Sequence, residues 1–358
     1  MAHKVAFIGF GGVGQGLMEI LRTKKENLKR SLGLEIEVVS ICDLIKGSIH
    51  HPDGLDIEKV AKVMQTTGQL EDYPEVDGLI RGWDSLTTIE HTNADTIIEI
   101  TYTDVHTGQP AIDHCRAAFQ NGKNVVMSNK GPVAVAYHEL SELAKEAGVA
   151  WGFEGTVMSG TPALRMPLVS LTGNEITEIK GILNGTTNFI LTEMEKGISY
   201  EEALKQAQQL GYAEADPTSD VEGYDALYKV VILANVLMGV PLKKEDVICK
   251  GITHLTLQDI EEAKLANKRY KMLGKIKKSG DHVVASVQPE KLDLSDPLAG
   301  VSGATNAITY ECDLSGPITL LGAGAGIMET GFALLIDIIN IDRNVIHAKQ
   351  NSALNVTT

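Results

Sequence analysis

Hydrophobic residues in the first part of the chain form short apolar runs, and stretches of helical spacing separate the later runs. After an opening run that ends before Gly9, the runs of strand length are 36–43, 94–101 and 123–130, and the helical stretches are 109–122 and 136–148. Strands that alternate with helices predict a parallel sheet with helices on both faces. We therefore predict a doubly wound α/β domain.

The opening stretch HKVAFIGFGGVGQGLMEILR reads as a strand, a tight turn and a helix, with glycines in the pattern GxGxxG. The first glycine permits the turn, the second lets a pyrophosphate approach the backbone, and the third lets the helix pack closely on the strand. The helix N-terminus attracts the phosphate charge. These features predict a dinucleotide site, a Rossmann fingerprint, built on Gly9, Gly11, Gly12, Val13 and Gly14.

Asp43 ends the next apolar run, where an acid accepts hydrogen bonds from the adenosine ribose hydroxyls. An acid at this position favours NAD, whereas Lys46 suits the 2′-phosphate of NADP, so both cofactors stay open. The structural alternative for Asp43 is a capping residue in a βα loop.

Thr101 and Lys130 end the two later runs. In a doubly wound sheet, ligands bind beyond the carboxyl ends of the strands, and both residues lie at that edge. We therefore place Thr101 and Lys130 in the cofactor site. The alternative reading of Lys130 is a solvated loop lysine.

The pattern changes beyond residue 153, where strand-like runs mix with helical stretches. The strand-like runs are 175–183, 282–290, 305–313 and 316–322, and the helical stretches are 199–211, 224–239 and 257–276. Such a mixture predicts an α+β domain. A chain of 358 residues is long for one core. We predict a dinucleotide-binding domain at 1–153, completed by a C-terminal helix at about 322–358, and a second domain at 154–321.

A second glycine cluster, GAGAG, precedes that last helix and includes Gly326. One interpretation is a close backbone crossing where the last helix rejoins the first domain. The other is a contact between Gly326 and the nicotinamide.

The stretch GYAEADPTSDVEGYDALYK, residues 211–229, places five acids ahead of Lys229 and leads into an uncharged run from Val230 to Val240. Asp225 and Lys229 are four residues apart and share one helix face, which is also the spacing of an ordinary surface pair. A helix that is apolar on all sides belongs in an interior. We therefore predict a desolvated pair, of the kind found where protons are moved.

Composition excludes several classes of protein. The net charge of −15 disfavours a nucleic-acid or anionic-membrane partner. No run reaches the ~20 apolar residues of a membrane span. The four cysteines lack the CxxC spacing of a zinc site or a disulfide framework, so we expect a cytoplasmic protein.

Taken together, these motifs resemble homoserine dehydrogenase. The segments GILNGTTNFIL, NVVMSNKGPVA, SGTPALRMPL and GAGAG are similar to family segments. The family signature is carried by Ala207, Gly211, Tyr212, Asp216, Pro217, Asp220, Gly223, Asp225 and Lys229. The resemblance implies the NAD(P)H-dependent interconversion of L-aspartate 4-semialdehyde and L-homoserine, a step in threonine and methionine biosynthesis.

The resemblance also implies roles for individual residues. Lys229 is expected to donate and accept the substrate proton, with Lys130 near both nicotinamide and substrate. Glu214 and Asp225 are expected to hold homoserine, and Asp220 to support them. Hydride transfer leaves a developing alkoxide that needs a positive charge and then a proton, which a lysine in a dry site supplies.

Further expectations come from the family alone. It binds a monovalent cation such as Na⁺, and Glu154, Val157, Ser159 and Thr161 match that site, with backbone carbonyls as most ligands. The second domain is expected to form a homodimer. Many members carry a C-terminal regulatory domain, which we do not expect here.

Two other functions compete with this interpretation. An aldehyde-oxidising dehydrogenase, such as aspartate-semialdehyde dehydrogenase, needs a thiolate nucleophile, and none of the four cysteines stands in a suitable motif. A non-catalytic dinucleotide-sensing module uses the glycine fingerprint without needing Lys229 or Lys130.

Overall fold

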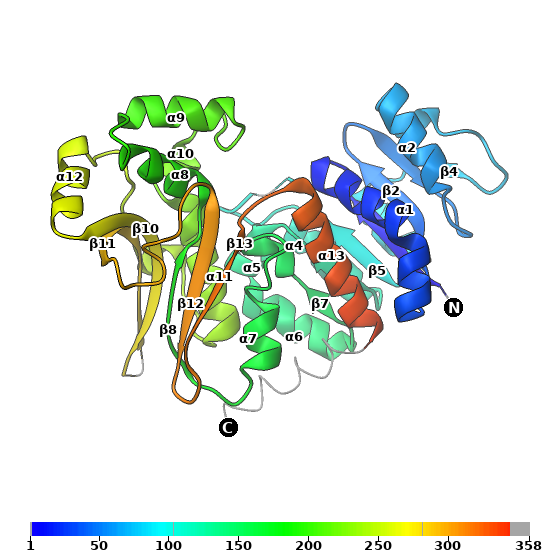
Figure 1. Cartoon of the computed structure of the whole chain (residues 1–358). Coiled ribbons are helices and arrows are strands. Elements are labelled where there is room, and N and C mark those ends of the chain that lie inside the picture. The colour runs from blue at the N-terminus through cyan, green and yellow to red at the C-terminus, as the bar shows by residue number, and fades with distance from the viewer. Residues whose placement is uncertain (1, 103, 281, 344–358) are drawn as a thin grey trace. The chain divides into compact units, whose positions relative to one another are not determined.

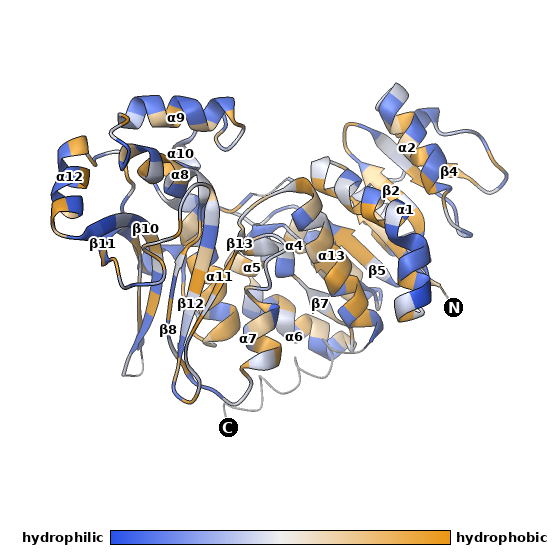
Figure 2. Ribbon diagram, viewed as in Figure 1, coloured by the Kyte–Doolittle hydropathy of each residue, from blue (hydrophilic) through white to orange (hydrophobic). Residues whose placement is uncertain are grey.

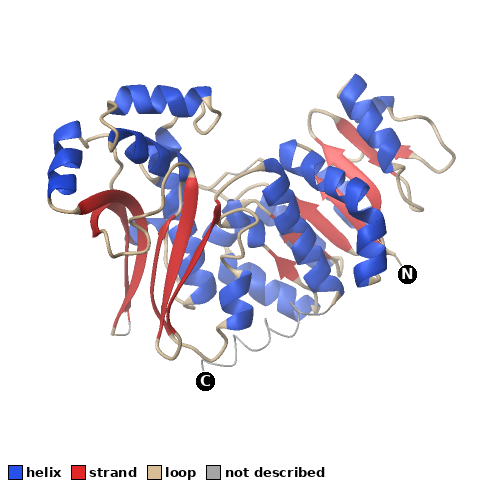
Figure 3. Ribbon diagram, in the orientation of Figure 1, coloured by secondary structure: helices blue, strands red, loops and turns tan. Residues whose placement is uncertain are grey.

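The computed structural model describes residues 2–102, 104–280 and 282–343. The chain divides into two compact units, of which unit 1 holds residues 1–156 together with the segment that starts at Gly326, and unit 2 holds 157–325. The domain boundaries predicted after residues 153 and 321 each fall a few residues earlier than these. Both units contain strands and helices (Figure 3).

Unit 1 contains a seven-stranded sheet in the order β4-β3-β2-β1-β5-β6-β7. Its strands are β1 (His3–Ile8), β2 (Ile36–Asp43), β3 (Gly47–His50), β4 (Ile80–Arg81), β5 (Thr96–Glu99), β6 (Asn124–Met127) and β7 (Trp151–Gly152). Its helices are α1 (Gly12–Leu32), α2 (Ile57–Thr66), α3 (Ser85–His91), α4 (Ala111–Gln120), α5 (Lys130–Val135), α6 (Tyr137–Ala147) and α13 (Ile327–Asp342), with 3₁₀ turns η1 (Leu70–Asp72) and η2 (Glu154–Thr156).

Five neighbouring strands of the sheet, β2, β1, β5, β6 and β7, pair in parallel, which confirms the doubly wound core. After Asp43 the chain does not enter a helix, because β2 turns back at once into the antiparallel strand β3. Asp43 is therefore the last residue of β2 at the start of a β-hairpin, rather than a residue of a βα loop.

Two groups of helices pack on this sheet. Helix α1 contacts both α2 and α13, and helix α4 contacts both α3 and α6. Figure 1 shows α13 beside α1, although their sequences lie at opposite ends of the chain. Apolar side chains of α1 and α13 enter one core with residues of the central strands, so the last helix completes unit 1.

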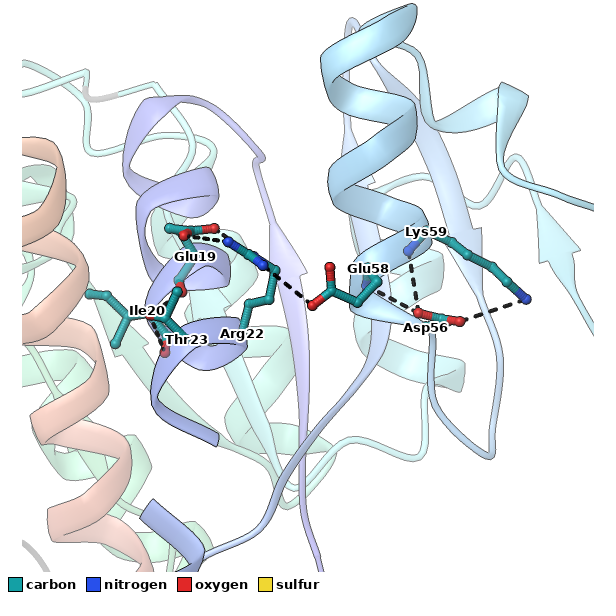
Figure 4. A network of polar contacts seen from close by, with 7 residues as sticks. All are labelled: Glu19, Ile20, Arg22, Thr23, Asp56, Glu58 and Lys59. Carbon is teal, nitrogen blue, oxygen red and sulfur yellow. Dashed lines mark hydrogen bonds and ion pairs between the residues drawn. The ribbon is translucent and has the colours of Figure 1, made fainter. Parts of the chain in front are cut away.

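A polar network on the surface joins α1 to α2 (Figure 4). Arg22 donates to Glu19 on its own helix at 2.8 Å and to Glu58 of α2 at 3.4 Å. Exposed pairs of this kind contribute little to stability.

Unit 2 is built on a six-stranded sheet in the order β13-β12-β8-β10-β11-β9. Its strands are β8 (Ile176–Ile182), β9 (Val247–Cys249), β10 (Lys268–Ser279), β11 (His282–Asp293), β12 (Thr305–Cys312) and β13 (Gly316–Ala323). Its helices are α7 (Arg165–Ser170), α8 (Gly185–Met194), α9 (Tyr200–Gln209), α10 (Thr218–Val221), α11 (Tyr224–Leu237) and α12 (Leu257–Leu265), with the 3₁₀ turn η3 (Lys244–Asp246).

The helix predicted at 257–276 is wrong beyond Leu265. Asn267 adopts a left-handed conformation with φ 56°, which ends the helix, and the chain continues as β10. Residues of β10 pair with both β11 and β8. Tertiary pairing therefore overrides the helical propensity of lysine, leucine and methionine in this segment.

Helix α11 crosses the sheet of unit 2 and is buried over most of its length. It starts at Gly223, whose φ of 88° is left-handed and where an added Cβ would lie 2.7 Å from Met272 Cε. Figure 2 shows the apolar character of α11 against the mixed colours of α9. This burial places the charged residues of its first two turns inside unit 2.

Candidate active site

The glycine turn of unit 1 joins β1 to α1. Gly9 has φ 92°, and a Cβ there would lie 2.6 Å from the Ile100 carbonyl oxygen, so only glycine fits. No side chain caps the N-terminus of α1, and a Cβ on Gly11 would meet only open space. The turn therefore leaves exposed backbone N–H groups at the start of a 21-residue helix, as a pyrophosphate requires.

Asp43 is bound to this turn. Its Oδ2 accepts the Phe10 N–H at 2.7 Å, and its Oδ1 accepts the N–H groups of Ile45 and Lys46, each at 3.0 Å. Burial opposes ionisation, but these three N–H groups and the Lys46 ammonium outweigh it and lower the pKa of Asp43. Asp43 is thus an ionised capping residue of a hairpin, and Oδ2 keeps one acceptor position.

Thr101 follows β5 and is held from two sides. Its hydroxyl and N–H donate to the buried carboxylate of Glu99, which also contacts His114 Nδ1 at 3.3 Å. Asn129 donates to the carbonyl oxygens of Thr101 and Tyr102 and caps α5, the helix that Lys130 begins. The sequence analysis missed Glu99 and Asn129, although both stand within two residues of predicted site residues.

Lys229 lies in unit 2 with only 6 % of its surface exposed. Its Nζ is 2.6 Å from Asp225 Oδ2 and donates to the Leu183 carbonyl oxygen at 2.6 Å. The predicted desolvation of this lysine is therefore present in the structure. A lysine buried beside a carboxylate is an arrangement that is common where protons are moved.

Asn184 ties Asp225 to Asp220, and in the sequence it lies within the family segment GILNGTTNFIL. Its Nδ2 donates to Asp220 Oδ1 at 2.6 Å and to Asp225 Oδ2 at 3.1 Å. Its Oδ1 accepts the Thr187 N–H at 2.9 Å and so caps α8. The cap fixes the direction of the amide, which then faces both carboxylates with its donor end.

Asp220 has a raised pKa. Burial is the main cause, and the neighbouring charge of Asp225 adds to it, while Asn184 and Lys229 oppose the shift. We call Asn184, Asp220, Asp225 and Lys229 the lysine–carboxylate cluster. Glu214 is exposed, and its side chain takes part in none of the hydrogen bonds described for this cluster.

The residues predicted to bind a cation fall into both units. Val157, Ser159 and Thr161 belong to unit 2, where Ser159 has φ 47°. The hydroxyls of Ser159 and Thr161 donate to the Ala323 carbonyl oxygen at 3.2 and 3.1 Å. In unit 1, the buried Glu154 N–H donates to Asp337 at 2.9 Å. Within the described ranges, no group of three or more histidine, cysteine or acidic residues is arranged to hold a metal ion.

Gly326 begins α13 in unit 1 with φ 145°. The helix that follows packs against α1, and a Cβ on Gly16 of α1 would lie 2.7 Å from the Ile327 backbone. The close-crossing interpretation therefore describes the start of α13 well.

Three of the four cysteines have thiols that ionise less readily than a free thiol. Burial raises the pKa of Cys115 well above its ordinary value, and burial also raises the pKa of Cys249 and of Cys312. A thiol whose pKa is raised is a poor nucleophile at neutral pH.

Among the described residues, no helix is long and apolar enough to cross a membrane.

One unit with a glycine turn at the start of a long helix and a second unit with a lysine buried beside a carboxylate are the arrangement expected of a two-domain nicotinamide-dependent oxidoreductase. Residues 9–154 match the model of the homoserine dehydrogenase NAD-binding domain, and residues 162–339 match the model of homoserine dehydrogenase itself. The chain belongs to the homoserine dehydrogenase family.

Individual relatives cover nearly the whole chain. The NAD(+)-dependent homoserine dehydrogenase of Pseudomonas canavaninivorans is 44% identical over 98% of this chain and 99% of its own. That of Methanocaldococcus jannaschii is 42% identical over 94% of this chain and 98% of its own.

Solved structures agree with these relatives. A homoserine dehydrogenase from Thiobacillus denitrificans has a TM-score of 0.82 at 32% identity, covering 98% of this chain and 75% of its own. A hyperthermophilic archaeal homoserine dehydrogenase mutant in complex with NADPH has a TM-score of 0.81 at 32% identity, covering 96% of this chain and 98% of its own. The predicted fold and activity are confirmed, and the thiol-dependent and non-catalytic alternatives are not favoured.

Proposed function

We propose that Lys229 carries the proton in the homoserine dehydrogenase reaction of this chain. The nicotinamide, when bound, supplies or accepts the hydride. In the reducing direction, Lys229 donates a proton to the aldehyde oxygen as negative charge develops on it; in the oxidising direction, the neutral amine accepts the hydroxyl proton. The observation that carries this proposal is the burial of Lys229 between Asp225 and the Leu183 carbonyl.

The carboxylates of unit 2 suit an amino-acid substrate. Asp220 and Asp225 lie side by side on Asn184, where an ammonium group would relieve their mutual repulsion. We assign Asp225 and Asp220 to the substrate, with Glu214 as a third carboxylate that reaches it from the exposed segment. Lys130 is assigned to nicotinamide and substrate because it follows β6 at the ligand-binding edge.

We also propose that unit 1 binds the cofactor and that NAD(H) is preferred. Asp43 is ionised, and Lys46 Nζ lies 3.8 Å from its Oδ1, so this ammonium is already balanced. A 2′-phosphate there would face a carboxylate, whereas a ribose hydroxyl can donate to it. The NAD(+)-dependent relative supports this choice.

Two further proposals rest on the family, and a third rests on the cysteines. Unit 2 forms a homodimer, which sedimentation measures. The backbone carbonyls near Glu154, Val157, Ser159 and Thr161 bind Na⁺, tested by replacing Na⁺ with choline in the assay. All four cysteines are free, which fits a cytoplasmic location.

The test is to supply L-homoserine with NAD or NADP at alkaline pH and to follow the reduced cofactor by absorbance. We expect turnover with a higher kcat/KM for NAD. Turnover only with NADP would overturn the assignment of Asp43, and no turnover with either cofactor would overturn the proposed function.

A further inference from the structure

One lysine of unit 2 is completely buried without a carboxylate bound to it. Lys271 of β10 is 0% exposed, and its Nζ donates to the Val301 carbonyl oxygen at 2.7 Å and to Asn188 Oδ1 at 3.2 Å. In the described part of the chain Lys271 forms no ion pair. We propose that Lys271 is a positioning residue for homoserine, which through α8 holds Asn184 against the carboxylates of the lysine–carboxylate cluster.

Lys271 occupies a position that suits an apolar side chain. Leu273, two residues further along β10, and Val301 belong to an apolar core cluster of unit 2. Burial lowers the pKa of Lys271, the charge of Glu195 opposes the shift, and that of Arg269 adds to it. An apolar side chain of similar length would avoid the cost of burying an amine. The hydrogen bonds of the amine are therefore what distinguishes lysine from a core residue at this position.

The first connection from Lys271 to the cluster runs along α8. The Asn188 amide, which accepts from Lys271 through Oδ1, donates through Nδ2 to the Thr305 carbonyl oxygen at 3.0 Å. Asn188 lies one turn after Asn184, whose carbonyl oxygen accepts the Asn188 N–H at 3.3 Å. Bonds at both ends of the Asn188 amide fix the first turn of α8, and with it the Asn184 cap that binds the two carboxylates.

The second connection runs through the loop before β12, which Lys271 also binds. In this loop the Gly303 N–H donates to Thr192 Oγ1 of α8 at 3.1 Å. The Ala304 carbonyl oxygen would lie 2.7 Å from a Cβ on Gly185, the first residue of α8. The loop thus contacts α8 at its first residue and again two turns later. Both connections therefore act on the end of α8 that carries the cap.

This arrangement should act on substrate binding more than on proton transfer. The ammonium group of homoserine would bind Asp220 and Asp225 together only while Asn184 keeps both in place. Lys229 lies on α11 and keeps its own bond to Asp225. The inference rests on the proposed binding of homoserine by Asp220 and Asp225 and adds Lys271 as the residue that supports them from the core.

The experiment compares variants of the full-length enzyme in homoserine oxidation with NAD. Lys271→Met keeps the side-chain length and removes the donor. We expect the KM for homoserine to rise roughly fivefold, the equivalent of one hydrogen bond, with kcat and the KM for NAD unchanged. Asn188→Ala breaks the same bond from α8 and should also raise the KM for homoserine. In the double variant the rise should be smaller than the product of the two single rises, because the two changes remove a shared interaction.

Thr309→Val is the matched control for a general loss of stability. Thr309 is buried, and its Oγ1 lies 2.8 Å from Thr319 Oγ1, so the change removes a hydrogen bond between β12 and β13 in which α8 takes no part. Denaturant unfolding should show a lowered midpoint for this variant, whereas its KM for homoserine should equal that of the wild type.

Three results would overturn the positioning role: an unchanged KM for homoserine in Lys271→Met, an equal rise in Thr309→Val, or a double variant whose rise equals the product of the single ones. If Lys271→Met does not fold, the comparison of Asn188→Ala with Thr309→Val decides in the same way. A wild-type enzyme without homoserine turnover would instead refute the proposed function.

Discussion

Lys229 Nζ lies 2.6 Å from Asp225 Oδ2, one turn earlier on the same buried helix. In water such a pair would be worth a few tenths of a kcal/mol. Inside unit 2 the Lys229 amine and the Asp225 carboxylate are direct partners, and removal of either would leave an uncompensated group in a region of low polarity. For this reason we assign the proton transfer of the reaction to Lys229 of this pair.

Substitution Lys229→Met should lower kcat by about a hundredfold or more, because it removes the group that transfers the proton. Cofactor binding, measured by fluorescence titration, should stay intact because Lys229 belongs to unit 2. Lys205→Met on the exposed side of α9 is the control and should keep wild-type turnover. Near-normal activity of Lys229→Met would contradict the assigned role.

The two ends of the Asn184 amide should affect different properties. The Nδ2 group, which binds the two carboxylates, should affect substrate affinity, and the Oδ1 atom, which caps α8, should affect stability. Asn184→Ala loses the cap of α8, at a cost of about 1 kcal/mol, and also loses the bonds to Asp220 and Asp225. Asn184→Ser can still cap the helix but cannot reach both carboxylates.

We therefore expect the KM for homoserine to rise roughly tenfold in both variants, with denaturant unfolding showing lost stability in Asn184→Ala alone. A serine variant with the wild-type KM would show that the amide does not organise the carboxylates.

Asp220 should make stability fall as the pH rises. Its pKa is raised above 3.8 in the folded state, so the folded chain binds the proton more tightly than the unfolded chain does. The resulting stabilisation is complete below 3.8 and is lost as the pH rises through the raised pKa. Asp220→Asn should therefore be more stable than the wild type at neutral pH, with the difference shrinking in acid.

Asp216 is a control, because its effect on the pH dependence of stability should be opposite to that of Asp220. Hydrogen bonds from the Thr218 hydroxyl and N–H lower the pKa of Asp216, so its stabilisation is present above 3.8 and is lost as the pH falls. Asp216→Asn should thus lose stability at neutral pH. Thermal unfolding at several pH values compares the two variants, and curves that shift in the same direction would refute this account.

Two glycines of the α1 region should affect different properties. A Cβ on Gly16 would lie 2.7 Å from the Ile327 carbonyl oxygen, so Gly16→Ala should cost about 1–3 kcal/mol by separating α1 from α13. Gly11 has φ −73° and open space around it, so Gly11→Ala should fold normally.

Its added methyl group would instead stand where the pyrophosphate approaches the backbone, and the KM for NAD should rise tenfold or more. Denaturant unfolding and steady-state kinetics measure the two effects. A Gly11→Ala enzyme with an unchanged KM would place the pyrophosphate elsewhere.

Local spacing was sufficient to predict several parts of this protein. The glycine turn depends on residues within six positions of one another, and the buried Lys229–Asp225 pair depends on four-residue spacing inside an apolar helix. Both rest on backbone geometry that neighbouring residues determine by themselves. The parallel core strands of unit 1 could also be predicted from their local pattern of apolar residues.

Other features were decided only by tertiary structure. Residues 268–276 carry helical propensity, yet they form β10 because β8 and β11 supply hydrogen-bonding partners on both sides. Asp43 stands at the start of a β-hairpin because β3 pairs back on β2. Neither partner strand can be read from the segment itself.

In the candidate site, too, some features could be predicted from the sequence and others depend on the tertiary structure. The sequence by itself determined which charged residue enters an apolar helix, because burial follows from the hydrophobic pattern around it. Only the fold decided that Asn184 joins two carboxylates 36 and 41 residues away, and that Glu99 holds Thr101 together with His114. Such contacts depend on the closure of long loops, which no local pattern of side chains encodes.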